Sequence, residues 1–110
     1  MDPRLEKEIY ELHSGVCSAL ADPKRIMLLY TLSYGRRNVG ELAEEHGLPQ
    51  PTTSRHLKVL RERGLVVTER DGSAIYYALA DRKLIEALDL LRSVLRGVYT
   101  RRAAVVDPTE

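Results

Sequence analysis

The chain has 110 residues, a formal net charge of +1, 44% apolar and 30% charged residues, and one cysteine. This length allows one domain with a modest core, and the single cysteine excludes an intrachain disulfide framework. The amino terminus mixes charges throughout and lacks the apolar core of a signal peptide, and no apolar run is long enough to span a bilayer. We therefore expect one cytoplasmic, globular domain with no membrane association.

The first third of the sequence predicts two helices. The first covers residues 4–20 and carries a narrow apolar stripe at spacings of four, three and four, made of Leu5, Ile9, Leu12 and Val16. Asp22-Pro23 is typical of an N-cap followed by proline at the first helical position, and it begins a helix over residues 24–34. Because this second helix is apolar on nearly all sides, we expect it at the centre of the fold.

The middle of the chain predicts a helix-turn-helix. Asn38 and Glu41 have the spacing of a capping box, and they begin a short helix that Gly47 should end. A second helix is predicted over residues 50–63. Two helices joined by a short turn that contains glycine form this motif.

A β-hairpin and a long helix should follow. Residues 65–70 and 74–79 are rich in β-branched and aromatic side chains, and Asp71-Gly72 between them is a strong turn signal. A hairpin directly after a helix-turn-helix is a wing. From Asp81 a helix is predicted to about residue 99, with an apolar stripe of Leu84, Leu88, Leu91, Leu95 and Val98.

These elements predict a mainly α winged helix-turn-helix, with four helices, a two-stranded hairpin and a fifth helix. Residues 1–102 should form one domain for DNA binding and dimerisation, and residues 103–110 a flexible tail. Each terminal helix carries an apolar stripe that a chain this short would struggle to bury. We therefore predict a homodimer through the first and last helices, although each stripe could instead pack on its own subunit's core.

The helix over residues 50–63 has the composition of a DNA-reading helix. Thr53, His56, Leu57 and Leu60 share one face, which should pack on the core. The opposite face carries short polar side chains near the start and cations further along. Side chains near the start of such a helix can bond base edges, and later cations meet phosphates. The candidates for DNA binding on this helix are Ser54, Arg55, Lys58 and Arg61.

Two further features of the sequence bear on DNA binding. Arg70 and Ser73 flank the tip of the predicted wing, where they could reach the DNA backbone or a minor groove. For any single candidate, an ordinary solvated side chain is the alternative. His56 lies on the inner face, so we interpret it as a packed, hydrogen-bonded histidine rather than a metal ligand or a catalytic base.

Three segments in order, ALADPKRIMLLYTL, VGELAEEHGLPQPTTSRHLKVLRERGLV and RDGSAIYYAL, closely resemble the ArsR/SmtB family of bacterial metalloregulatory repressors. The resemblance runs from about Cys17 to Leu79. It implies a winged helix-turn-helix dimer that represses operons until an inducer binds. It also implies DNA contacts by residues at the positions of Gln50, Thr52, Ser54, Arg55 and Arg70. Pro49 departs from the family pattern, which usually has serine there.

The resemblance does not extend to the family's metal sites. Both thiolates of one site are missing, because its four positions are Asn38, Val39, Gly40 and Glu41. The site on the last helix keeps only its aspartate, with Asp81, Lys83, Val94 and Gly97 at its positions. A lysine cannot replace a neutral imidazole as a ligand at neutral pH.

His13 and Cys17 are weak candidates for a transition-metal site. They are four residues apart on one predicted helix, and a dimer would supply four such ligands. A thiol redox sensor is a further possibility. The alternatives are a small buried cysteine and a partly exposed histidine without special function. A small inducer and a partner protein also remain open as signals.

The sequence therefore favours a regulator that binds an inverted-repeat operator in double-stranded DNA. The alternative is a winged helix that binds a partner protein without specific DNA binding. Ser14, Cys17 and His13 are neighbours, but nothing arranges a nucleophile, a base, an orienting carboxylate and an oxyanion donor. No phosphate-binding loop or His-Glu-x-x-His motif is present. We therefore do not expect an enzyme.

Overall fold

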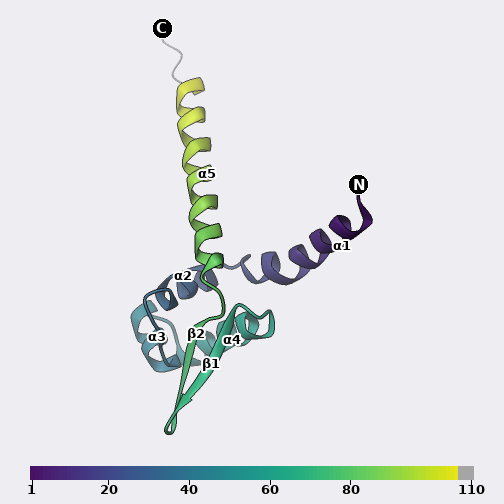
Figure 1. The fold of residues 1–110 in the computed structure, drawn as a ribbon. Coiled ribbons are helices and arrows are strands. Elements are labelled where there is room, and N and C mark those ends of the chain that lie inside the picture. The colour runs from purple at the N-terminus through teal and green to yellow at the C-terminus, as the bar shows by residue number, and fades with distance from the viewer. Residues whose placement is uncertain (107–110) are drawn as a thin grey trace.

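The computed structural model of the chain describes residues 1–106, and their order of elements is the predicted one (Figure 1). In chain order the elements are α1 (Pro3–Leu12), a π-helical segment (His13–Cys17), α2 (Pro23–Leu32), α3 (Val39–His46), α4 (Gln50–Glu62), β1 (Val66–Asp71), β2 (Ala74–Leu79) and α5 (Lys83–Val106). The fold is a winged helix-turn-helix, mainly helical, with one antiparallel hairpin.

The core is built around α2, as its apolar composition predicted. Leu28, Leu29 and Leu32 of this helix are buried. Side chains from the neighbouring elements complete the cluster: Ala19, Leu42, Leu57, Leu60, Val66, Ile85 and Leu88. The core thus joins the helix-turn-helix, the root of the wing and the first turns of α5 into one body.

Local hydrogen bonds account for the helix boundaries. The carboxylate of Asp22 accepts from the backbone N–H of Lys24 at 2.8 Å, which begins α2. At the start of α3, Asn38 Oδ1 accepts from the Glu41 N–H at 2.8 Å, and Glu41 Oε1 accepts from the Asn38 N–H at 2.9 Å. Gly47 ends α3 with a φ of 61°, a conformation that favours glycine. The predicted caps are therefore confirmed.

The first helix differs from the prediction over residues 4–20. It is α-helical only to Leu12 and then widens into the π-helical segment, where the Ser18 N–H bonds to the His13 carbonyl. The Ser18 hydroxyl donates to the carbonyls of Ser14 at 2.6 Å and Gly15 at 3.0 Å. A serine hydroxyl that bonds back to the preceding turn competes for its carbonyls and bends a helix, which accounts for the widened turn.

The wing is a β-hairpin with a two-residue loop. The segment around Arg37 pairs with β2 beside it. Asp71 pairs with Ala74, so the loop is Gly72 and Ser73, and Asp71 belongs to the strand rather than to the predicted turn. At the root, Arg37 and Tyr77 exchange backbone hydrogen bonds of 3.0 and 2.7 Å. The sequence placed Arg37 in a loop, so this pairing was missed.

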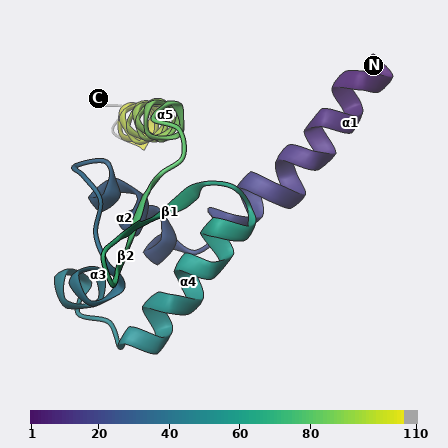
Figure 2. The ribbon, with the colours of Figure 1, turned by 60° about the horizontal axis from the view of Figure 1, so that its bottom comes forward.

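Two helices project from the body instead of packing on it. The radius of gyration is 17.6 Å, whereas a compact chain of this length has about 13 Å. Figures 1 and 2 show α1 and α5 leaving the body in different directions. On α1, the side chains of Leu5, Ile9 and Leu12 are between 44% and 50% exposed. One copy of the chain therefore leaves this apolar stripe uncovered.

The structure corrects the predicted stripe on α5. Leu88 is only 5% exposed and lies in its own subunit's core, and Leu84 packs against that core. Both lie in the first turns of α5, which rest on the body; the buried Leu88 has almost no surface left for a second copy, whereas Leu84 is half-buried. Leu91 and Leu95 are 60% and 47% exposed. The uncovered surface is wider than predicted, because it also includes Leu90, Val94 and Tyr99.

The end of α5 also differs from the prediction. The helix continues to Val106, so residues 103–106, the first part of the predicted tail, are helical. Ala103 and Ala104 are strong helix formers, and residues 83–106 contain no proline. The rest of the predicted tail, residues 107–110, lies outside the described residues. Among the described helices, none combines the length and the apolar character needed to cross a membrane.

We predict that Leu95→Glu separates the dimer into folded monomers, because the change places an unpaired carboxylate in an apolar contact. Sedimentation velocity measures the association state, and circular dichroism measures the retained helix. Ser93→Glu adds the same charge on the polar side of α5 and should leave the dimer intact. A Leu95→Glu protein that stays a tight dimer would contradict the interface.

Leu88→Ala should act on folding, because it opens a cavity in the core. The free energy of unfolding should fall by about 2–5 kcal/mol. Urea denaturation measures this loss. A loss no larger than that of Tyr34→Ala, whose side chain is 85% exposed and lies outside α1 and α5, would contradict the placement of Leu88 in the core.

Thr53 is the one polar side chain that is fully buried in the described part of the chain. Its hydroxyl donates to the Pro49 carbonyl at 3.1 Å, but that carbonyl also accepts the Thr53 N–H at 3.0 Å. Thr53→Ala should therefore lower the free energy of unfolding by about 1–2 kcal/mol through lost packing. Thr53→Val keeps the shape and should recover most of that loss in urea denaturation. A valine variant as unstable as the alanine variant would show that the loss of the hydroxyl, and not the loss of packing, lowers the free energy of unfolding.

Candidate nucleic-acid interface

The turn between α3 and α4 sets the direction of α4. After Gly47, the N–H of Leu48 bonds back to the Ala43 carbonyl at 3.0 Å, and α4 begins at Gln50. Thr53, Leu57 and Leu60 anchor α4 in the core, as predicted. The opposite face is therefore held toward solvent.

The first turn of α4 has no side-chain cap. Pro49 stands at the N-cap position and offers no hydrogen-bonding side chain, and Pro51 has no N–H. The N–H groups of Gln50 and Thr52 therefore lie at the positive end of the helix dipole without a side-chain acceptor. Such a helix end suits an anion, for example a phosphate. Serine in place of Pro49 would compete for these donors.

The predicted DNA-binding side chains of α4 lie on its outer side. Gln50, Ser54, Arg55, Lys58 and Arg61 are exposed, and Thr52 is half-buried. A guanidinium N–H of Arg55 donates to the Thr52 hydroxyl at 3.1 Å, so these two side chains meet near the start of the helix. None of the three cations forms an ion pair with the described residues. Their charges are thus available to an outside partner.

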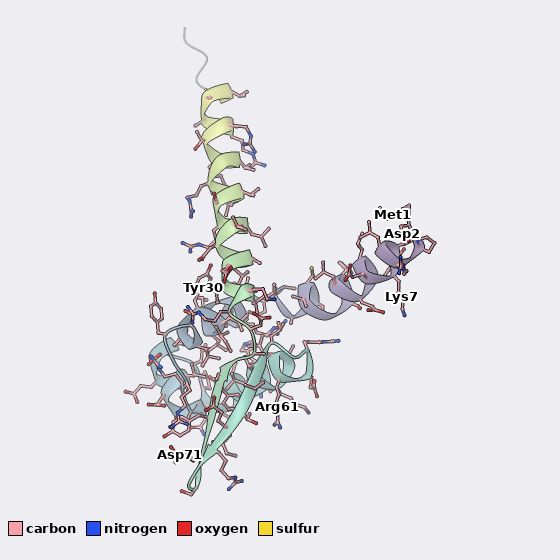
Figure 3. The ribbon with its side chains drawn as sticks, viewed as in Figure 1. Met1, Asp2, Lys7, Tyr30, Arg61 and Asp71 are labelled. Atoms are coloured by element: carbon pink, nitrogen blue, oxygen red, sulfur yellow. The ribbon has the colours of Figure 1, made fainter. Side chains whose placement is uncertain are left out.

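The wing lies beside α4 (Figures 1 and 2). Its two faces carry side chains of different charge. Because side chains alternate along a strand, Arg70 lies on the same face as Val66, which is buried in the core. Glu69 and Asp71 lie on the other face. Lys58, Arg61 and Tyr77 line a groove between α4 and the hairpin, and Figure 3 shows Arg61 on α4 near the wing, with Asp71 further along the hairpin. Ser73 is exposed in the wing loop.

His56 is packed between α4 and the start of α2, as its place on the inner face predicted. Its Nδ1 lies 3.5 Å from an N–H group of Arg25 and 3.9 Å from the Asp22 carboxylate. Arg25 also donates to the Ala19 carbonyl at 2.6 Å. Arg25, on α2, therefore links the chain that follows the π-helical segment to His56 of α4, a contact that the sequence did not indicate.

A second polar joint holds the foot of α5. The Tyr30 hydroxyl donates to the Asp89 carboxylate at 2.7 Å, and Arg92 lies 3.4 Å from the same carboxylate oxygen. Partial burial, and then the bond to Asp89, raise the pKa of Tyr30. A tyrosine hydroxyl is protonated at neutral pH in any case, and this shift extends its role as a donor to more alkaline pH. Figure 3 places Tyr30 at the junction of α5 with the body.

The weak metal candidates gain no further ligands. His13 and Cys17 are both exposed, so Cys17 is not the buried side chain that we considered. No three His, Cys, Asp or Glu side chains gather as a metal site in the described part of the chain. Asp81, the aspartate that matches the family's site on the last helix, accepts from the Lys83 N–H at 2.8 Å and so caps the start of α5.

The sequence is similar to known bacterial regulators. Residues 22–68 match the family described as bacterial regulatory protein, arsR family. The chain is 45% identical to the biofilm growth-associated repressor of Agrobacterium fabrum over 89 residues, which cover 78% of this chain and 75% of the relative. It is 37% identical to the nodulation protein NolR of Rhizobium meliloti over 92 residues, or 84% and 75% of the two chains.

Solved structures agree with these relatives. Rv0081 of M. tuberculosis superposes with a TM-score of 0.78 at 38% identity, over 87% of this chain and 97% of that one. The homodimeric winged helix-turn-helix DNA-binding domain of Mb0332 from Mycobacterium bovis, a possible ArsR-family regulator, superposes with a TM-score of 0.75 at 28% identity, over 87% and 88% of the two chains. With its fold, its motifs and these relatives, the chain belongs to the ArsR family of bacterial regulatory proteins.

Proposed function

We propose that this chain is a homodimeric transcriptional regulator that binds an inverted-repeat operator and represses until an inducer releases it. One observation carries the proposal: the exposed face of α4 combines an uncapped helix start with base-reading side chains and three cations that have no acidic partner among the described residues. The repressors among the relatives support the assignment. A regulator of this kind acts in the cytoplasm.

Each side chain has a proposed role. Gln50, Thr52, Ser54 and Arg55 lie at the start of α4 and contact base edges in the major groove. The uncapped N–H groups of the first turn hold a phosphate. Lys58 and Arg61 bind backbone phosphates, and Arg70 and Ser73 extend the contact from the wing.

The dimer gives the proposal its geometry. Exposed apolar side chains on α1 and α5 supply a surface that a second copy covers. A two-fold axis through that surface presents two copies of α4 to one side of a duplex. Half-sites about 34 Å apart then match one turn of DNA. An inducer acts only if it binds the DNA-competent and the incompetent dimer with different affinity.

A protein-binding winged helix is the rival function. An acidic partner could also cover the cations of α4, but it would not need base-reading side chains beside them. Binding to duplexes selected from a random library separates the two. A regulator enriches one inverted repeat and loses affinity steeply as salt rises, whereas the rival enriches no sequence.

We predict that Arg55→Ala weakens binding to the selected operator by about 1–3 kcal/mol and binding to unrelated DNA much less, because a base contact carries sequence information. Lys58→Ala should weaken both about equally and lower the salt slope by about one, because a phosphate contact does not. Fluorescence anisotropy at several salt concentrations measures all of these values.

Arg63→Ala is the matched control. It removes one exposed cation from the end of the same helix, away from the proposed face. We expect a smaller loss than with Lys58→Ala. Equal losses in all three variants, on operator and unrelated DNA alike, would contradict the assigned roles.

A further inference from the structure

Arg36, in the loop between α2 and α3, contacts one face of the wing. One guanidinium N–H donates to Asp71 Oδ2 at 2.8 Å, and another lies 3.5 Å from Glu69 Oε1. The guanidinium carbon lies 4.1 Å from the centre of the Tyr76 ring. The bond to Asp71 raises the pKa of Arg36. One side chain thus contacts both strands of the hairpin.

The three contacts share one face of the wing. Glu69 is paired with Tyr76 across the hairpin, and Asp71 lies two residues further along β1. Arg70 points to the other face because strand side chains alternate. The next residue after Arg36, Arg37, is fixed to Tyr77 by two backbone hydrogen bonds. The base of Arg36 is therefore held at the root of the wing while its guanidinium reaches toward the tip.

The acidic face presents an electrostatic problem for a DNA-binding wing. Two carboxylates near the tip repel the phosphates that Arg70 has to approach, and like charges brought together weaken an interface. Arg36 places a positive charge against both. Because its planar guanidinium stacks on Tyr76 as it bonds the carboxylates, it also fixes the direction of the hairpin.

We propose that Arg36 is a positioning residue for DNA binding, which holds the wing and neutralises Glu69 and Asp71 so that Arg70 can meet a phosphate. This inference rests on the proposed function. Arg36 acts through the wing and does not itself contact DNA. A direct phosphate contact by Arg36 is the competing explanation, and the two differ in what happens when the acids are removed.

A mutant cycle separates these explanations. Its members are Arg36→Ala, the pair Glu69→Gln with Asp71→Asn, and all three changes together, each measured by anisotropy on the duplex that the unmodified protein selects. We expect Arg36→Ala to bind about fivefold more weakly. With the acids already removed, the same change should cost less than about twofold. Arg36→Lys keeps the charge but not the paired and stacked geometry, so it should recover only part of the loss.

Hydrogen exchange of the wing amides gives a second measurement that does not need DNA. Arg36→Ala should speed exchange at residues 67–76 and leave α2 and the dimer unchanged. If the unmodified protein binds no duplex, the proposed function fails. Exchange of the wing amides still tests whether Arg36 holds the hairpin in place. Unchanged exchange at these amides, or a full fivefold loss with the acids removed, would overturn the role of Arg36.

Discussion

The structure depends on one constraint: the chain forms two helices whose apolar stripes its own core does not fully cover. The core extends only into the first turns of α5 and does not include α1. The apolar surface of both arms is stable in water only against more apolar surface, which a second copy supplies in the dimer that we propose. Polar contacts tie both arms to α2: Arg25 donates to the carbonyls of Ala19 and Ser18 at the end of the first arm, and Tyr30 donates to Asp89 of α5.

The positive surface of α4 arises from the distribution of ion pairs and not from a high net charge. The net charge of +1 gives no indication of a nucleic-acid partner. However, some acidic side chains are paired with arginines, such as Glu45 with Arg37 and Asp71 with Arg36. The cations of α4 are left without such partners among the described residues. A nearly neutral protein thus gains a local positive surface, which is what steering toward a phosphate backbone requires.

The parts of the fold that follow from local chemistry could be predicted from the sequence. The Asp22 and Asn38 caps, the left-handed Gly47 and the inner face of α4 each depend on residues a few positions apart. Leu88 could not be placed, because helical periodicity shows which residues share a stripe but not where the stripe stops facing its own core. The hydrogen bond from Arg36 to Asp71 joins residues 35 apart in the chain, and only the folded structure brings them together. The widened turn after Leu12 depends on which backbone carbonyls accept the Ser18 hydroxyl. The spacing of apolar residues carries no information about that hydrogen bond.

The most direct test of this account is the salt dependence of binding to a duplex selected by the protein from a random library. We expect an inverted repeat with half-sites about one helical turn apart. We also expect an affinity that falls steeply and linearly on logarithmic axes as salt rises, with two chains on each duplex. Selection of no common sequence, or an affinity that salt does not change, would contradict the central claim that paired α4 helices meet DNA.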